Sequence, residues 1–359
     1  MLICKHLLKT AAVLGVILVL NSCSDDPTAP EDEDPFNNPP VAGELDPFIQ
    51  NQRLGRGMNL GNALEAPNEG EWGVVLEDWF FEKIKNAGFH SVRIPVRWSA
   101  HAAADPPYAL EAMFVDRVKW AVEQALSREL LVVLNIHHYD ELIQDPAGEK
   151  ARFLGIWRNI AAEFKDYPGE LIFEVLNEPN GDLNTALWNS YLAEAIAVIR
   201  ERNPGRTIMV GPANWYSLYY LSNLDLPGDD QNIIVSFHYY NPFQFTHQGA
   251  EWVTGSDAWL GTTWIGTMDE QQAVLDDLTF AADWGALHNR PLNIGEFGAY
   301  YKADMTSRAR WTAFVTSRAE MLDMSWSYWE FIAGFGAYDP AADEWRTPLL
   351  NALIPPALP

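Results

Sequence analysis

The chain has 359 residues, of which 48% are hydrophobic, and its formal net charge is −25 at pH 7. A chain of this size can bury a large core and fits one large domain with appendages. Its acidity argues against nucleic acid or an anionic membrane surface as a partner, because both repel negative charge.

Residues 1–22 have the composition of an export signal. Lys5 and Lys9 precede a short apolar run at 11–20, and the chain then reads Asn-Ser-Cys up to Cys23. The run is too short to cross a bilayer comfortably. The ending resembles bacterial lipoprotein signals, which implies cleavage before Cys23 and lipidation there; an ordinary secretory signal with an incidental cysteine is the alternative. We therefore expect an exported protein, lipid-anchored to a bacterial outer membrane on its periplasmic side or at the cell surface.

Residues 23–46 form an acidic, proline-rich segment. It contains eight acidic residues and no lysine or arginine, a composition that predicts a disordered, extended tether. Cys4 and Cys23 are the only cysteines, so the folded part has no thiol for a disulfide or a metal site. We assign residues 47–359 to a single folded domain.

Eight short apolar runs follow one another in this domain, each with a helical pattern behind it. Segments such as 113–128 and 187–202 repeat apolar residues every three or four positions. Strand and helix alternating eight times predict an α/β fold, the (β/α)8 or TIM barrel. A doubly wound sheet is the alternative, but no glycine-rich phosphate loop follows the first strand. The predicted strands are 57–60, 91–95, 131–136, 171–176, 207–210, 233–238, 292–295 and 325–329.

Two of these runs lead directly into a glutamate. Leu-Ile-Phe-Glu-Val-Leu-Asn-Glu-Pro contains Glu178, and Pro-Leu-Asn-Ile-Gly-Glu-Phe-Gly contains Glu296. A carboxylate buried without a partner costs several kcal/mol, so a fold rarely carries one there without a reason. A barrel points both acids into one cleft, which is the arrangement that breaks a glycosidic bond. For Asn177 and Glu178 taken alone, a turn with a helix-capping acid is the alternative.

Charged, imidazole or aromatic groups stand at the other strand ends as well. Seven of the eight ends carry a charged or imidazole group, a convergence that stability alone rarely produces. These residues are Asn62 and Glu65 after the first strand, Arg93 in the second, His137 and His138 after the third, His238 and Tyr240 at the sixth, and Trp329 and Glu330 at the eighth, whereas Trp215 follows the fifth.

Six motifs in order carry a family resemblance. They are Arg-Ile-Pro at 93–95, Asn-Ile-His-His at 135–138, Leu-Asn-Glu-Pro at 176–179, His-Tyr-Tyr at 238–240, Gly-Glu-Phe-Gly at 295–298 and Tyr-Trp-Glu-Phe at 328–331. Together they resemble glycoside hydrolase family 5, whose clan places its acids at the ends of strands four and seven. The segments 55–67 and 245–252 resemble thermophilic bacterial endo-β-1,4-glucanases of one subfamily, which is known for cutting both glucan and mannan.

The resemblance implies that Glu178 is the general acid/base and Glu296 the nucleophile. Retention of configuration requires the two carboxyl groups to lie about 5–5.5 Å apart. We expect apolar surroundings and the charge of Glu296 to raise the pKa of Glu178, and Arg93 to keep Glu296 ionised. In support, Asn177 should bond the sugar 2-hydroxyl, His238 should lie near Glu178, and Tyr240 should orient Glu296.

Substrate-binding residues are implied along the cleft. Trp329 resembles the family's sugar platform, since an indole face stacks on a pyranose ring, and Trp215 and Trp252 are further candidates. His137 and His138 should line the cleft; a metal site is the alternative, which their adjacent positions on a strand disfavour because neighbouring side chains point to opposite faces. The outer subsites are assigned to Asn62, Glu65 and His247, with a structural role as the alternative for Glu65.

The sequence thus predicts an exported, lipid-anchored, retaining endo-β-1,4-glucanase that acts on a β-linked polysaccharide as a monomer, without a metal or cofactor. A β-mannanase, or an enzyme that cuts both glucan and mannan, is the alternative within this class. A non-catalytic, glycan-binding surface lipoprotein is the remote alternative, and the presence of both Glu178 and Glu296 argues against it.

Overall fold

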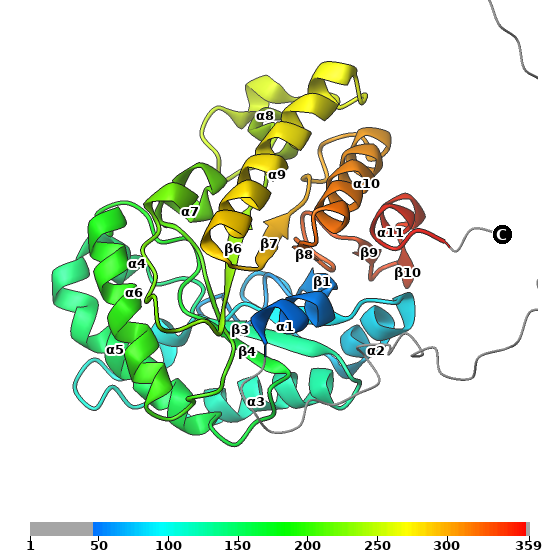
Figure 1. Cartoon of the computed structure of the whole chain (residues 1–359). Coiled ribbons are helices and arrows are strands. Elements are labelled where there is room, and N and C mark those ends of the chain that lie inside the picture. Colours follow the sequence, from blue (N-terminus) through cyan, green and yellow to red (C-terminus); the bar gives the residue numbers. More distant parts are fainter. Residues whose placement is uncertain (1–45, 357–359) are drawn as a thin grey trace, which may run out of the picture. The chain divides into compact units, whose positions relative to one another are not determined.

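The computed structural model describes residues 46–356. Its centre is a closed barrel of eight parallel strands in chain order, in which β8 pairs back onto β1. Helices surround this barrel (Figure 1), so the predicted (β/α)8 fold is confirmed. The strands are β1 (Arg56–Asn59), β2 (Ser91–Ile94), β3 (Leu131–Asn135), β4 (Leu171–Glu174), β5 (Ile208–Val210), β6 (Ile233–His238), β7 (Leu292–Phe297) and β8 (Ser325–Tyr328).

The predicted N-terminal segments lie almost entirely outside the described residues. This holds for the signal peptide at 1–22, for the lipidation site Cys23, and for the tether at 23–46 except Asp46. The Asp46 side chain accepts a hydrogen bond from the Phe48 amide and caps α1 (Pro47–Leu54). No helix within residues 46–356 is long and apolar enough to cross a bilayer.

Most strands are followed by a helix that packs on the outside of the barrel. The longest, α9, begins with a capping box, in which Thr267 and Glu270 each accept a hydrogen bond from the other's amide. Such a box satisfies amides at a helix start that lack intrahelical partners. The helices are α2 (Asp78–Ala87), α3 (Ala112–Leu126), α4 (Asp140–Gln144), α5 (Pro146–Glu163), α6 (Thr185–Arg200), α7 (Ala213–Tyr216), α8 (Phe243–Thr246), α9 (Met268–His288), α10 (Met305–Met321) and α11 (Thr347–Leu353), with 3-10 helices η1 (Trp98–His101), η2 (Leu218–Asn223) and η3 (Ser256–Trp259) and a small hairpin of β9 (Tyr338–Asp339) and β10 (Glu344–Trp345).

The segment after β5 departs from the expected helical stretch. It holds only the single turn α7 and the short η2. Asn214, Trp215 and Tyr216 have φ values of 63°, 58° and 52°, a left-handed conformation that costs about 1–2 kcal/mol per residue. A right-handed helix cannot pass through them. The turn instead leaves the indole of Trp215 54% exposed.

The inside of the barrel changes character along its axis. At the N-terminal end, α1 closes the barrel: Asn51 donates to the Leu292 carbonyl at 2.9 Å and accepts from the Ser325 hydroxyl at 2.7 Å. At the C-terminal end the buried side chains include charged groups, among them Arg93 and Glu174. Buried polar groups need partners, so this end carries the network described next. The apolar cluster at the closed end comprises Leu54, Leu131, Val133, Ile172, Met209 and Ile234.

Candidate active site

The two predicted acids meet at the C-terminal end of the barrel. β4 ends at Glu174, so Glu178 lies in the following loop, with φ 48°. Glu296 lies in β7, where it pairs with His238 of β6 at a register shift. One carboxylate oxygen of Glu178 lies within 4.8 Å of one of Glu296. This spacing fits the separation of about 5–5.5 Å in retaining glycosidases and is too short for the roughly 6.5–9.5 Å of inverting ones.

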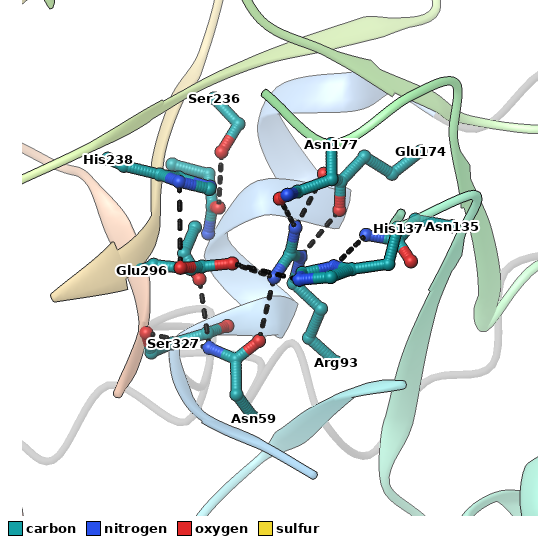
Figure 2. Close-up of polar contacts among 12 residues, drawn as sticks. Asn59, Arg93, Asn135, His137, Glu174, Asn177, Ser236, His238, Glu296 and Ser327 are labelled. Carbon is teal, nitrogen blue, oxygen red and sulfur yellow. Dashed lines mark hydrogen bonds and ion pairs between the residues drawn. The ribbon is translucent and has the colours of Figure 1, made fainter. Parts of the chain in front are cut away.

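A buried guanidinium organises the nucleophile side of the site. Figure 2 shows Arg93 between Glu296 on one side and Glu174 with Asn177 on another. Arg93 Nη1 donates to Glu296 Oε1 at 2.7 Å and to Asn59 Oδ1 at 2.9 Å. Its Nε and Nη2 donate to the two oxygens of Glu174 at 2.6 and 2.8 Å, and Nη2 also donates to Asn177 Oδ1 at 2.8 Å. All five N–H groups of the guanidinium are therefore used.

Glu296 accepts a hydrogen bond on each oxygen. Arg93 donates to Oε1, and the Tyr240 hydroxyl donates to Oε2 at 3.0 Å. Burial raises the pKa of Glu296 overall and the charge of Glu178 adds to this, while the charge of Arg93 and its hydrogen bond lower it. Contact with a permanent cation and a phenol favours the carboxylate form that a nucleophile needs.

Glu178 has a different environment. Its Oε1 lies 2.7 Å from His238 Nδ1, and its side chain is 28% exposed. Burial raises the pKa of Glu178 to about 7; the Arg93 charge lowers it and the Glu174 charge raises it. The expected charge interaction between the two acids appears at Glu296, whose pKa the charge of Glu178 raises. Burial lowers the pKa of His238 to about 4, so its imidazole is neutral at pH 7 and Glu178 can keep its proton.

The two histidines after β3 lie close together. β3 ends at Asn135, so the expected alternation of side chains along a strand does not apply, and the rings lie 4.7 Å apart. His137 Nδ1 lies 3.1 Å from Asn135 Nδ2, and His137 Nε2 lies 3.9 Å from Glu296 Oε1. The Trp329 ring lies parallel to the His137 ring at 5.5 Å. Burial lowers the pKa of both histidines, so both are neutral donors or acceptors at pH 7.

A cleft of about 510 Å³ opens beside Glu178. Trp215 and Trp252 line it and are 54% and 60% exposed. His247 also lines it, with its ring stacked on Phe243 at 4.0 Å. Exposed aromatic groups gathered at a cleft indicate a binding surface. Lining residues that were not predicted include Asn214, Tyr219, Asn241 and Phe243.

The loop after β1 holds two of the predicted substrate-binding residues, Glu65 and Asn62. Glu65 is 1% exposed, and its carboxyl group accepts hydrogen bonds from the amides of Asn62 and Ala63. Glu65 therefore closes the loop from inside, which fits its structural alternative; its contact with substrate stays a prediction. Asn62 is half-buried and, like Glu65, is not among the residues that line the 510 Å³ cleft. Trp72, which was not singled out from the sequence, is 40% exposed in the same loop and contacts the ring of His138.

The comparisons with known proteins agree with this geometry. The sequence model of the family described as Cellulase (glycosyl hydrolase family 5) matches residues 56–333. This chain belongs to glycosyl hydrolase family 5. Both acids, Arg93 and Trp329 lie within the matched range.

Relatives of this family 5 member carry endoglucanase names. Endoglucanase H of Acetivibrio thermocellus is 36% identical over 87% of this chain, which spans 34% of that protein. Endoglucanase B of Clostridium cellulovorans is 30% identical over 83% of this chain and 73% of its own length. The structure of Thermotoga maritima Cel5A in complex with mannotriose has a TM-score of 0.85 and 52% identity, over 86% of this chain and 100% of its own. A structure of the same protein in complex with cellobiose gives the same values.

Two residues of the family 5 site were not predicted from the sequence. Glu174 and Asn59 are both 0% exposed, and both accept hydrogen bonds from Arg93. Glu174 is an acid inside an apolar run, and Arg93 is a base inside another. A buried charge needs an opposite partner, so these two positions carried a signal for their pairing.

One group of side chains among the described residues has spacing suitable for a metal ion: Glu178, His238 and Glu296. The Arg93 guanidinium already contacts Glu296 at 2.7 Å, and this fixed positive charge repels a second cation. His137 and His138 belong to no such group within residues 46–356. The chemistry that the two carboxyl groups can perform needs no metal.

Proposed function

We propose that this chain is a retaining endo-β-1,4-glucanase that hydrolyses internal bonds of cellulose, mixed-linkage glucan or glucomannan. The observation that carries the proposal is the pair of carboxyl groups within 4.8 Å of each other in opposite environments. Glu296 contacts a guanidinium and a phenol, whereas Glu178 contacts a neutral imidazole. An open cleft with exposed indoles suits a polymer that is bound along its length.

The reaction takes two displacements. In the first, a Glu296 oxygen attacks the anomeric carbon while Glu178 gives its proton to the glycosidic oxygen. The bond between that carbon and that oxygen breaks, its electron pair stays on the leaving oxygen, and a glycosyl ester of Glu296 forms. In the second, Glu178 takes a proton from water, and the water oxygen attacks the same carbon and releases Glu296. Two inversions retain the configuration.

Neighbouring groups bind the sugar through the donors left to them. Asn177 Oδ1 accepts from Arg93, so its amide NH2 is the group available to donate to the 2-hydroxyl, a bond that strengthens in the transition state. His137 Nδ1 accepts from Asn135, so its Nε2 carries the proton and serves as a donor. Trp329 adds an apolar face beside His137.

A β-mannanase, or an enzyme with both activities, is the second candidate. It is favoured by the similarity to Thermotoga maritima Cel5A, for which complexes with mannotriose and with cellobiose exist. Glucose and mannose differ in the orientation of the 2-hydroxyl, the group assigned to Asn177. The site can therefore distinguish the two substrates through only a few contacts.

The proposal is tested by initial rates of residues 24–359 on carboxymethyl-cellulose, barley β-glucan and glucomannan, beside a folded Glu296→Ala variant. We expect rapid mid-chain cutting of the glucans, which the variant loses. Cutting mainly on mannan would favour the second candidate. No cutting of any polymer would overturn the enzyme assignment and favour the glycan-binding lipoprotein.

We also propose that the mature protein is anchored to the outer membrane by lipid on Cys23, on the strength of the signal-like sequence at 1–22. Cys23→Ala should release the protein from membranes, and continued membrane association would contradict the anchor. Protease treatment of intact cells separates a cell-surface from a periplasmic orientation. One chain supplies every site residue named here, so we propose a monomer, which sedimentation velocity tests.

A further inference from the structure

Glu174 is a buried carboxylate that takes no direct part in the two displacements. It is the last residue of β4 and is 0% exposed, and Arg93 donates to both of its oxygens at 2.6 and 2.8 Å. A buried ion pair is often no more stabilising than apolar side chains of similar volume. Stability alone therefore does not account for the pair, and its place beside both acids points to the reaction.

We propose that Glu174 is a positioning residue that acts through Arg93. Its carboxylate fixes the guanidinium and neutralises its charge, so that Arg93 aligns Glu296 without stabilising the ionised form of Glu178. The inference rests on the proposed function, because it assigns Glu174 a role in that reaction.

The charges around Arg93 during the reaction give the first reason. Before the reaction, one guanidinium faces the carboxylates of Glu174 and Glu296. When Glu296 becomes an ester, the negative charge leaves the contact with Arg93 and appears on Glu178, which has given up its proton. Glu174 then remains as the partner of Arg93, so no unpaired cation is left in the barrel, where it would be costly. The negative charge of Glu174 also favours the oxocarbenium-like transition state.

The electrostatics of Glu178 give the second reason. Burial has the largest effect on the pKa of Glu178 and raises it. Next in size, the Arg93 charge lowers this pKa and the Glu174 charge raises it. Among the facing groups, only Arg93 is a permanent cation, so removal of the Glu174 charge leaves that cation uncompensated. The charged and titratable groups that face Glu174 and Glu178 are Arg93 of β2, Tyr216 of α7, His238 of β6, Tyr240 after β6 and Glu296 of β7; His137 after β3 faces Arg93 and Glu296.

The direct test is the pKa of Glu178 in a Glu174→Gln variant. It is measured by 13C NMR of the glutamate side-chain carboxyl groups, with the signal assigned from Glu178→Gln. We expect a fall of about one unit, the size of effect that one nearby charge produces. An unchanged or higher value would overturn the proposal. Because this titration needs no substrate, it is independent of which polymer the wild type cuts, and a failure of the proposed function appears separately in the wild-type rates.

Kinetics give a second readout. The alkaline limb of kcat/KM reports the acid of the free enzyme, so it should move to lower pH by the same unit in Glu174→Gln. At the optimum pH, kcat should fall about tenfold or more with KM little changed, because the loss is in the transition state. A slower enzyme whose alkaline limb stays in place would show a purely structural role and overturn the proposal.

Two further variants separate charge from shape. Glu174→Asp keeps the charge but shortens the side chain, so the pKa of Glu178 should stay within a few tenths of a unit; it also keeps the proposal testable if Glu174→Gln does not fold. A clear downward shift in Glu174→Asp would contradict the role of charge. The matched control is Glu320→Gln, which removes a carboxylate from Arg56 at the start of β1, a contact of 2.8 Å at the other end of the barrel. Its pH profile should match that of the wild type, and the same shift there would refute a local effect.

Discussion

Replacement of Glu178 by glutamine should separate substrates by their leaving groups. Glutamine keeps the size of the side chain and its place beside His238, but it has no proton to give. A positioned general acid contributes about 10²–10⁴-fold, so kcat on β-glucan, whose leaving oxygen is a sugar hydroxyl, should fall by about that factor. On a dinitrophenyl cellobioside the first displacement needs little acid help, so its rate should stay close to that of the wild type.

The pKa of about 7 for Glu178 sets the pH range of this effect. In the wild type the protonated fraction is about one half at pH 7 and about one hundredth at pH 9. The value of kcat/KM on glucan should therefore fall about tenfold per pH unit above 7. The variant has no group that titrates in this position, so its first displacement on the activated substrate should be nearly independent of pH between 7 and 9.

Stopped-flow measurement of dinitrophenolate release provides the assay. The second displacement still needs Glu178 as a base, so the variant should give a burst followed by slow turnover, and azide, a nucleophile that needs no base, should restore turnover. Equal losses on the activated substrate and on glucan would refute the acid role. So would an alkaline limb that persists unchanged in the variant.

Three other predictions follow from the described contacts. Trp215→Ala should raise KM on β-glucan several-fold and leave kcat within about twofold, because an exposed indole supplies binding area that is the same in the ground and transition states; an equal change on a short aryl glycoside would contradict this. Glu65→Gln should flatten the dependence of stability on pH. Burial raises the pKa of Glu65 in the folded state to about 8, above the ordinary 4.5, so the folded state keeps a proton that the unfolded chain releases. The contribution of Glu65 to the free energy of unfolding therefore decreases as pH rises from about 4.5 to 8, by an amount on the order of several kcal/mol. Urea unfolding at pH 5, 6.5 and 8 checks this, and an identical slope in wild type and variant would count against it. Dialysis against EDTA should leave activity unchanged, because the two-carboxyl reaction needs no metal and Arg93 already contacts Glu296; a loss that added metal restores would return Glu178, His238 and Glu296 to consideration as a metal site.

The barrel could be predicted because buried parallel strands leave a strong local signal. The run at 233–238 places Ile233, Val235 and Phe237 on one face, and β6 (Ile233–His238) spans the same residues. The helical stretch expected after β5 is reduced to the single turn α7 and the short η2, because the left-handed residues Asn214 to Tyr216 interrupt it. Asparagine adopts this conformation more readily than most residues, but Trp215 and Tyr216 seldom do, so the local sequence did not predict the interruption.

The site was predictable to the extent that its residues stand in motifs. Glu178, Glu296 and Arg93 occur in such motifs, whereas the places of Asn59 and Glu174 around Arg93 depend on register. Asn59 lies opposite Arg93 in the pairing of β1 with β2, and Asn135 lies opposite Glu174 in the pairing of β3 with β4. The alignment of neighbouring strands around a closed barrel depends on its shear, which one sequence does not reveal.

That register explains why the central cation is an arginine. The closed barrel brings acceptors from β1, β4, β7 and the loop after β4 around one point, and Arg93 meets them with five N–H groups in a planar fork. A lysine has three donors on one nitrogen and cannot contact Glu174 twice while also reaching Asn59, Asn177 and Glu296. At least two buried acceptors would lose their partners, and a buried acceptor without a partner is destabilising. The same five contacts hold Glu296 as a carboxylate and orient Asn177 for the sugar, so the charge and the geometry of the site have one structural origin.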